Sequence, residues 1–337
     1  MSQTVAVFGA YGHTGRFVVA ELLDRGFVPL LLGRDAGKLQ TLAASYPGLE
    51  YRVASAGELD RALTGASAVV NTAGPFAATA GPVIDAAVRA GIPYVDVAAE
   101  IEANADTFAR TADVPVVPAM AFFGGLGDLL VTTAMDEWTT ADEVHVAYGL
   151  SSWHPTAGTL AAGAVSHDRR AGRRVRYRGG RLEYYAGDLP TLEWTFPAPL
   201  GTRSVLGEFS MADIVTIPSH LAVPEVRTYM TTDAAADLAG PDTPTPVPVD
   251  ELGRSAQTFT VDVVVRAGDA QRRAVATGQD IYAISAPLAV EALGRILSGR
   301  TRTSGVASAG AMFDAPDFLR ALSRYLTVES VEAAHSR

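Results

Sequence analysis

The chain contains no cysteine and only one lysine, Lys38, among its 27 basic residues. Without cysteine there can be no disulfide, no zinc–thiolate site and no thiol nucleophile. Because the only lysine stands at position 38, a Schiff-base lysine elsewhere in the chain is excluded. The Tyr-x-x-x-Lys pair of short-chain dehydrogenases is excluded as well, since Arg34 stands four residues before Lys38.

Long apolar runs and an excess of positive charge are also missing. No apolar stretch is long enough to span a bilayer, and the first residues lack the basic segment of a signal peptide, so we expect a cytoplasmic protein that does not enter a membrane. The 37 acidic residues outnumber the basic ones and give a net charge of −10, which disfavours nucleic acid as a partner. The histidines are not spaced as metal ligands, so we expect no metal site.

The 337 residues are enough for about two domains, and the first part alternates strands with helices. The predicted strands are Thr4–Phe8, Val28–Leu32, Ala68–Thr72, Tyr94–Ala98 and Val114–Pro118. The predicted helices between them include Gly37–Ser45, Leu59–Leu63 and Pro82–Ala90. This alternation is typical of an α/β fold with a doubly wound parallel sheet, which binds ligands at the carboxyl ends of its strands.

A glycine-rich loop connects the first predicted strand to the first predicted helix. Its spacing, G-x-x-G-x-x-G, is one residue looser than the common G-x-G-x-x-G. Glycine permits the tight turn and a close backbone approach, and the free N–H groups at the helix start can receive a pyrophosphate. We therefore predict that this loop binds a dinucleotide cofactor through Gly9, Tyr11, Gly12, His13, Thr14 and Gly15.

The end of the second predicted strand indicates which dinucleotide binds. Gly33 leaves room, Arg34 can pair with a 2′-phosphate and lie over adenine, and Lys38 adds a second positive charge. Asp35 can alternatively be interpreted as a ribose ligand typical of NAD enzymes, although capping of the following helix is the role we favour. These residues predict NADP(H) as the cofactor.

Two segments at later strand ends face the same predicted crevice. Thr72, Ala73, Gly74, Pro75 and Phe76 are assigned to the cofactor site, with Phe76 packing on the nicotinamide ring; the alternative is an ordinary turn with a buried phenylalanine. Glu100 is a candidate catalytic residue that orients the substrate or relays a proton. Alternatively, Glu100 only stands at the start of the next helix, where its negative charge interacts favourably with the helix dipole.

The middle of the chain supplies candidate substrate contacts. Phe122 and Phe123 precede a glycine-rich turn and can line a pocket or belong to the core. Ser152, Trp153 and His154 stand at a strand-to-helix turn and are predicted to form a substrate wall. His154 is the second candidate catalytic residue, because imidazole exchanges protons near neutral pH; the alternative is a surface histidine in a capping turn.

An arginine-rich hairpin follows. Seven arginines lie within Arg169–Arg181, around a Gly179-Gly180 pair typical of a two-residue turn. The segment is expected to be a solvated face or a dimer contact, or to receive an acidic carrier protein or a phosphorylated thioester. Further predicted strands at Asp213–Ile217, Val226–Thr231, Phe259–Arg266 and Arg272–Thr277 indicate a mainly antiparallel second sheet.

Several of these segments resemble one family. Gly9–Arg16, Gly33–Asp35, Val69–Phe76, Tyr94–Glu100, Gly278–Tyr282 and Ser304–Leu319 are similar to the saccharopine dehydrogenase-like group of NADP-binding oxidoreductases. The resemblance implies a Rossmann domain of residues 1–125 and 281–337, interrupted by an α+β substrate and dimerisation domain of residues 126–280. It also implies a homodimer.

The resemblance implies reduction of C=N bonds, as in saccharopine reductase, or of C=C bonds, as in trans-acting enoyl reductases. Without cysteine and with a single lysine, catalysis would depend on cofactor placement, desolvation and a single acid. Such limited catalytic machinery is sufficient for a bond that is already polarised, as a C=N bond is. We therefore predict an NADPH-dependent imine reductase acting on a small molecule. An enoyl reductase for a thioester or lipid-like substrate is one alternative, and a non-catalytic NADP(H)-binding redox sensor is another.

Overall fold

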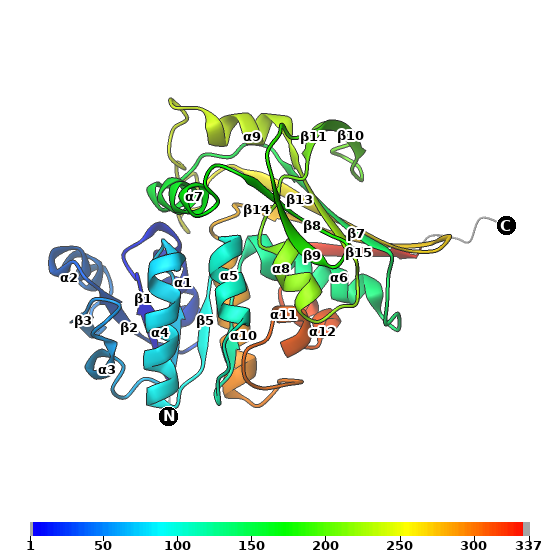
Figure 1. Ribbon diagram of the computed structural model, residues 1–337. Helices are drawn as coiled ribbons and strands as arrows, with labels where there is room; N and C mark the ends of the chain where they lie inside the picture. Colours follow the sequence, from blue (N-terminus) through cyan, green and yellow to red (C-terminus); the bar gives the residue numbers. More distant parts are fainter. Residues whose placement is uncertain (1–2, 333–337) are drawn as a thin grey trace.

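The computed structural model describes residues 3–332 and contains the predicted parallel sheet (Figure 1). Its six strands have the order β3-β2-β1-β4-β5-β6, the order of dinucleotide-binding folds. They are β1 (Thr4–Phe8), β2 (Val28–Gly33), β3 (Tyr51–Val53), β4 (Ala68–Asn71), β5 (Tyr94–Asp96) and β6 (Val116–Val117). All neighbouring pairs are parallel, which confirms the predicted α/β doubly wound sheet.

Both faces of this sheet are buried, as its apolar strands require. Val5 and Val7 of β1 pack in one core, whereas Ala6 and Phe8 pack in the other. The first core is covered by α1 (His13–Asp24), α2 (Ala36–Ser45) and α10 (Ser285–Leu297). The second core is covered by α3 (Leu59–Ala62) and α4 (Phe76–Ala90), and α5 (Ile101–Phe108) follows β5.

A second, nine-stranded sheet lies beyond the carboxyl ends of the first (Figure 1). Its strands are β7 (Glu143–Leu150), β8 (Arg174–Arg178), β9 (Arg181–Tyr185), β10 (Thr191–Thr195), β11 (Thr202–Gly207), β12 (Glu225–Thr231), β13 (Thr258–Ala267), β14 (Ala270–Gln279) and β15 (Leu326–Glu332). The path β10-β11-β12-β7-β13-β14-β15 contains one parallel pair, β12 with β7, and the β8–β9 hairpin joins it at β12. The sheet is therefore mainly antiparallel, as predicted.

The remaining helices all follow β6 in the chain. They are α6 (Gly127–Met135), α7 (Ala157–Arg169), α8 (Asp213–Thr216), α9 (Thr232–Ala239), α11 (Ala309–Met312) and α12 (Ala315–Ala321), with short turns η1 (Phe122–Leu126) and η2 (Ile217–Ser219). The predicted strand Asp213–Ile217 is wrong, because these residues form α8 and the start of η2. No helix in residues 3–332 is long and apolar enough to cross a membrane.

The division into residues 1–125 with 281–337 and residues 126–280 stays a prediction. Helix α10 packs against α1, β4 and β5, beside the first sheet. However, β15 pairs with β14 along Leu326–Glu332, so this strand lies in the second sheet and not in the first. Hydrogen bonding to β14 determines where this last strand lies, although α10, earlier in the chain, packs beside the first sheet.

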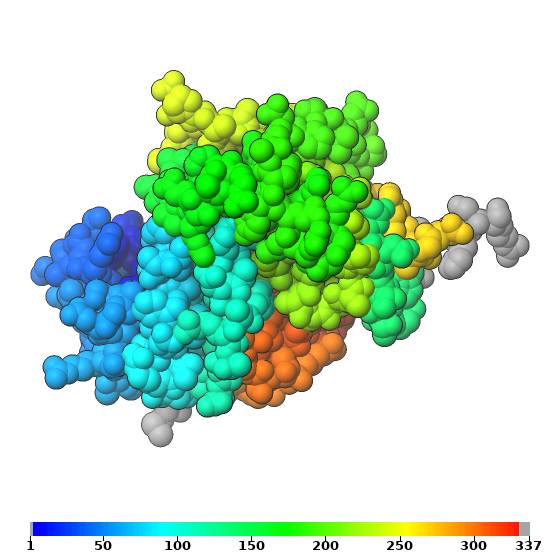
Figure 2. Space-filling model, in the orientation of Figure 1, coloured from blue at the N-terminus to red at the C-terminus, as the bar shows by residue number. Residues whose placement is uncertain are grey.

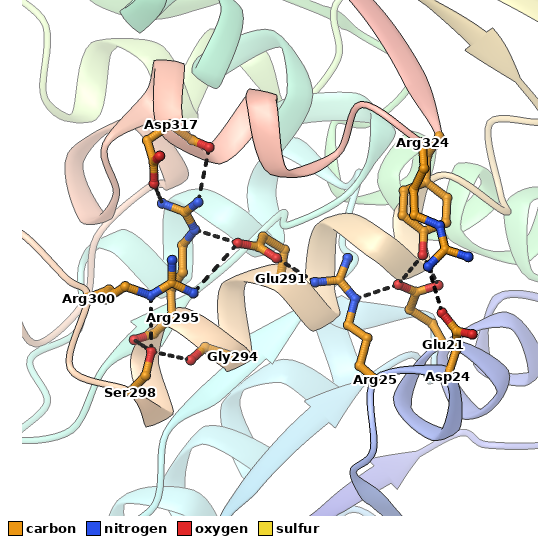
Figure 3. A network of polar contacts seen from close by, with 11 residues as sticks. Glu21, Asp24, Arg25, Glu291, Gly294, Arg295, Ser298, Arg300, Asp317 and Arg324 are labelled. Carbon is orange, nitrogen blue, oxygen red and sulfur yellow. Dashed lines mark hydrogen bonds and ion pairs between the residues drawn. The ribbon is translucent and has the colours of Figure 1, made fainter.

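A network of ion pairs fastens the C-terminal helices to α1 (Figure 3). Arg25 pairs with Glu21 at 2.6 Å and also with Glu291 of α10. Arg295, one turn further along α10, lies 2.7 Å from Glu291 and 2.8 Å from Asp317 of α12. Only 2% of the Arg295 side chain is exposed, so its charge depends on these carboxylates.

Candidate functional site

A cleft of about 1620 Å³ lies between the two sheets. Its floor is the carboxyl edge of the parallel sheet, and its opposite wall includes α7, the start of β8 and residues of α9. In Figure 2 the green segments that include α7 and β8 rest on the cyan layer that includes α4 and α5. Two ion pairs connect the end of α7 to α5. Arg169 lies 2.7 Å from Asp106, and Arg170 pairs with Glu102.

The glycine loop forms one end of this cleft. Gly9 has φ +91°, and a Cβ there would lie 2.8 Å from the Ala73 nitrogen. A Cβ on Gly15 would lie 2.2 Å from the Gly9 oxygen, so only glycine lets the helix start approach the loop. No side chain caps the N-terminus of α1 and no acidic residue stands in its first turn. Free N–H groups and the positive end of the helix dipole therefore meet at the cleft, which fits a pyrophosphate.

The end of β2 presents positive charge to the same cleft. Arg34 and Lys38 line it, and the Tyr11 ring fills the space beside Gly33, where a Cβ would lie 2.5 Å from Tyr11 Cε1. Asp35 caps α2, because its carboxylate accepts a hydrogen bond from the Lys38 N–H at 3.0 Å. Asp35 also lies 3.8 Å from Lys38 Nζ, whereas Arg34 has no carboxylate within 4.0 Å among residues 3–332.

The turn after β4 is held by a buried carboxylate. Glu100 accepts hydrogen bonds from the N–H groups of Phe76 at 2.6 Å and Ala77 at 3.0 Å, at the start of α4. Burial raises the pKa of Glu100, while these two bonds oppose the shift. Glu100 immediately precedes α5, but its side chain makes no capping bond there. Its carboxylate bonds the start of α4 instead and fixes the turn beside the cleft.

A second carboxylate at the end of β5 is structural. Asp96 accepts hydrogen bonds from Tyr94 Oη at 2.7 Å and from the N–H groups of Ala98 and Ala119 at 3.0 and 2.8 Å. Complete burial raises the pKa of Asp96 to about 6. Asp96 does not line the cleft, so its role is to hold the strand end that carries Glu100.

An aromatic cluster forms the wall of the pocket. The ring centroids of Phe122 and Phe123 are 4.8 Å apart, and those of Phe123 and Trp153 are 5.1 Å apart. All three residues line the cleft, and each is also at least 93% buried, so they belong to both pocket and core.

Tyr282 connects this wall to the glycine loop. Its hydroxyl accepts hydrogen bonds from Trp153 Nε1–H at 3.2 Å and from the Thr156 N–H at 3.3 Å. Its ring lies 5.1 Å from the His13 ring, edge to face. Burial lowers the pKa of His13, which favours the neutral imidazole beside the loop.

The cleft brings most of the predicted site residues together. Those that line it are Gly9, Tyr11, Gly12, His13, Thr14, Gly33, Arg34, Lys38, Thr72, Ala73, Gly74, Phe76, Glu100, Phe122, Phe123 and Trp153. Gly15, Pro75, Ser152 and His154 do not line it, although Gly15 and Pro75 support the lining loops. His154 takes part only through its carbonyl oxygen, which accepts a hydrogen bond from Tyr282 Oη at 3.3 Å, so its assignment as a catalytic residue has no support from the geometry.

Sequence reasoning missed several lining residues. Tyr282 stands in the segment that carries the family resemblance, yet no role was predicted for it. Phe209, Met211, Arg173 and Arg174 also line the cleft. The run Phe209-Ser210-Met211 gives no local sign of a pocket, because only the fold brings Phe209 beside Trp153 in the cleft.

Comparisons with known proteins agree with this arrangement. A family model described as NAD(P)H-binding matches residues 9–114. Apo saccharopine dehydrogenase (L-Glu forming) from Saccharomyces cerevisiae matches with a TM-score of 0.64 and 12% identity, covering 98% of this chain and 100% of that one. The chain therefore has the saccharopine dehydrogenase fold, and the predicted resemblance is confirmed at the level of the fold.

Other solved structures match smaller parts. UDP-N-acetylglucosamine 4-epimerase from Bacillus cereus is 23% identical over 30% of this chain and 37% of that one, with a TM-score of 0.24. Yeast methylglyoxal/isovaleraldehyde reductase complexed with NADPH is 16% identical over 29% of this chain and 38% of that one, with a TM-score of 0.26. No curated protein sequence gives a significant match to the chain.

Proposed function

We propose that the protein is an NADPH-dependent oxidoreductase that reduces the C=N bond of a small molecule. The observation that carries this proposal is a single cleft that contains both a dinucleotide cradle and an aromatic pocket. Gly9, Gly12 and the start of α1 would hold the pyrophosphate, and Arg34 the 2′-phosphate. When bound, NADPH supplies a hydride. The residues of this chain orient the substrate, exclude water and provide charge.

Reduction of C=N is favoured by the charged groups of the cleft. Glu100 and Glu208 are the acidic residues that line it, and Lys38, the chain's one lysine, lies at the opposite end beside Tyr11. Glu208 already pairs with Arg176, whereas in residues 3–332 no basic side chain lies within 4.0 Å of the Glu100 carboxylate. Glu100 lines the same cleft as the aromatic residues, and in its anionic form it would stabilise a protonated imine. Such a substrate needs no proton donor during reduction.

The preference for NADPH can be tested through Arg34. Arg34→Ala is expected to weaken NADPH binding by about tenfold or more, because a charged hydrogen bond contributes about 1.5–3 kcal/mol. NADH affinity should change little, since NADH lacks the 2′-phosphate. Both affinities are measured by titration of nicotinamide fluorescence, with Arg61→Ala, an exposed arginine outside the cleft lining, as the matched control. Equal losses for the two cofactors would rule out a 2′-phosphate contact.

A deuterium-transfer experiment tests the reaction itself. The protein is incubated with NADPH deuterated at the reactive nicotinamide carbon and with an extract of small metabolites, and mass spectrometry detects products that gain deuterium. We expect label on a carbon bonded to nitrogen, absent when protein is omitted. Label in an acyl chain would support enoyl reduction instead. Binding of NADPH without any labelled product would favour the redox sensor.

The homodimer and the cytoplasmic location remain parts of the proposal that the family resemblance and composition suggest. An acidic carrier protein at Arg169–Arg181 is less well supported, since carboxylates of this chain already pair with most of these arginines. Sedimentation equilibrium would test the dimer.

A further inference from the structure

The aromatic wall of the cleft continues away from the glycine loop. Trp153, which is hydrogen bonded to Tyr282 beside the loop, has its ring centroid 6.2 Å from that of Phe209. The hydroxyl of Ser210 donates a hydrogen bond to the carbonyl of Val175, the residue after Arg174. Trp153, Phe209 and Ser210 therefore line the cleft from the residues beside the cofactor loop to the beginning of β8.

The arginines at that end of the cleft differ in their partners. Within residues 3–332, Arg173 and Arg174 have no carboxylate within 4.0 Å, and both line the cleft and are exposed. The other arginines of the segment are paired: Arg169 with Asp106, Arg170 with Glu102, Arg176 with Glu183 and Glu208, Arg178 with Glu225, and Arg181 with Glu183. The positive charge that this segment leaves uncompensated is thus at residues 173 and 174.

Arg173 is also held in place. Its Nε–H donates to the Arg170 carbonyl at 3.1 Å, and its guanidinium lies 5.3 Å from the centre of the Tyr184 ring. A positioned guanidinium loses less conformational entropy when it binds an anion. Because Arg34 and Lys38 provide positive charge at the cofactor end, Arg173 and Arg174 are available for a different anionic group.

We infer that Arg173 and Arg174 bind the acidic group, a carboxylate or a phosphate, of a substrate whose apolar body lies along Trp153 and Phe209. This inference rests on the proposed function and assigns the substrate class of the same cleft: an elongated, apolar small molecule with a terminal anion. The arginine pair sets specificity, and the aromatic surface determines the length of apolar body between the anion and the reacting bond.

Calorimetric titrations with simple compounds test this inference, with and without saturating NADP⁺. Octanoate and octyl phosphate carry both an apolar body and an anion, 1-octanol lacks the anion, and acetate lacks the body. We expect both octyl anions to bind about tenfold or more tightly than 1-octanol or acetate, given the usual contribution of charge-assisted hydrogen bonds. A difference between the two octyl anions distinguishes carboxylate from phosphate.

Two double variants with the same change in charge complete the test. Arg173→Gln with Arg174→Gln should reduce octanoate and octyl phosphate to about the affinity of 1-octanol. Arg178→Gln with Arg181→Gln, in the same hairpin but outside the cleft lining, should leave all affinities unchanged. Similar losses in both variants, or similar binding of octanoate and 1-octanol by the native chain, would overturn the inference. If the anions bind as expected but NADP⁺ does not bind, the proposed function fails while the anion site stands.

Discussion

Replacement of Arg295 by methionine is expected to lower the free energy of unfolding by about 3–5 kcal/mol, the usual cost of removing one partner from a buried ion pair. Arg295 is 2% exposed and separates Glu291 of α10 from Asp317 of α12 (Figure 3). Methionine fills a similar volume but leaves Glu291, itself 6% exposed, without its nearest cation on α10. Urea unfolding followed by circular dichroism measures the change.

A neighbouring arginine provides the matched control. Arg300 lies 4.0 Å from the same Glu291, but its side chain is 57% exposed. Arg300→Met should therefore cost less than about 1 kcal/mol, as exposed ion pairs do. Equal costs for the two arginines would show that burial does not determine the contribution of this network.

The fold was predictable wherever local sequence and burial agree. The strands β1, β2 and β4 are apolar because both of their faces are covered, and their runs are visible in the sequence. Tyr51–Val53 was missed because β3 is short and partly exposed at the sheet edge. Asp213–Ile217 was assigned wrongly, since a short apolar run does not distinguish a buried strand from one turn of buried helix.

The candidate site shows a similar distinction between features set by residues close in sequence and contacts between residues far apart in the chain. That Gly9 and Arg34 line one cleft could be predicted, because the loop after β1 and the charge after β2 depend on residues close in sequence. The place of Tyr282 in the cleft could not be predicted, because its hydroxyl reaches Trp153 across 129 positions. For the same reason the sequence could not show that Arg173 lacks the distant carboxylate partners that Arg169 and Arg170 have.

Replacement of Gly15 by alanine is expected to weaken both NADPH and NADH by about 100-fold, because forcing apart a packed backbone typically costs up to about 3 kcal/mol. The added Cβ would lie 2.2 Å from the Gly9 oxygen and 2.9 Å from the Ala10 oxygen. Neither contact is with a flexible side chain, so the start of α1 must move away from the loop. The N–H groups that would receive the pyrophosphate then no longer converge.

Gly15→Ala should weaken the binding of both cofactors, whereas Arg34→Ala should weaken the binding of NADPH alone. Gly294→Ala on α10 is the matched control, since the nearest atom to its added Cβ, Phe27 Cζ, is 4.0 Å away. This control should keep both affinities and gain a little helix stability. Fluorescence titration gives the affinities, and thermal unfolding verifies that Gly15→Ala remains folded. A folded Gly15→Ala protein that binds both dinucleotides normally would show that the glycine loop is not the cofactor site, and the proposed reductase activity would lose its structural basis.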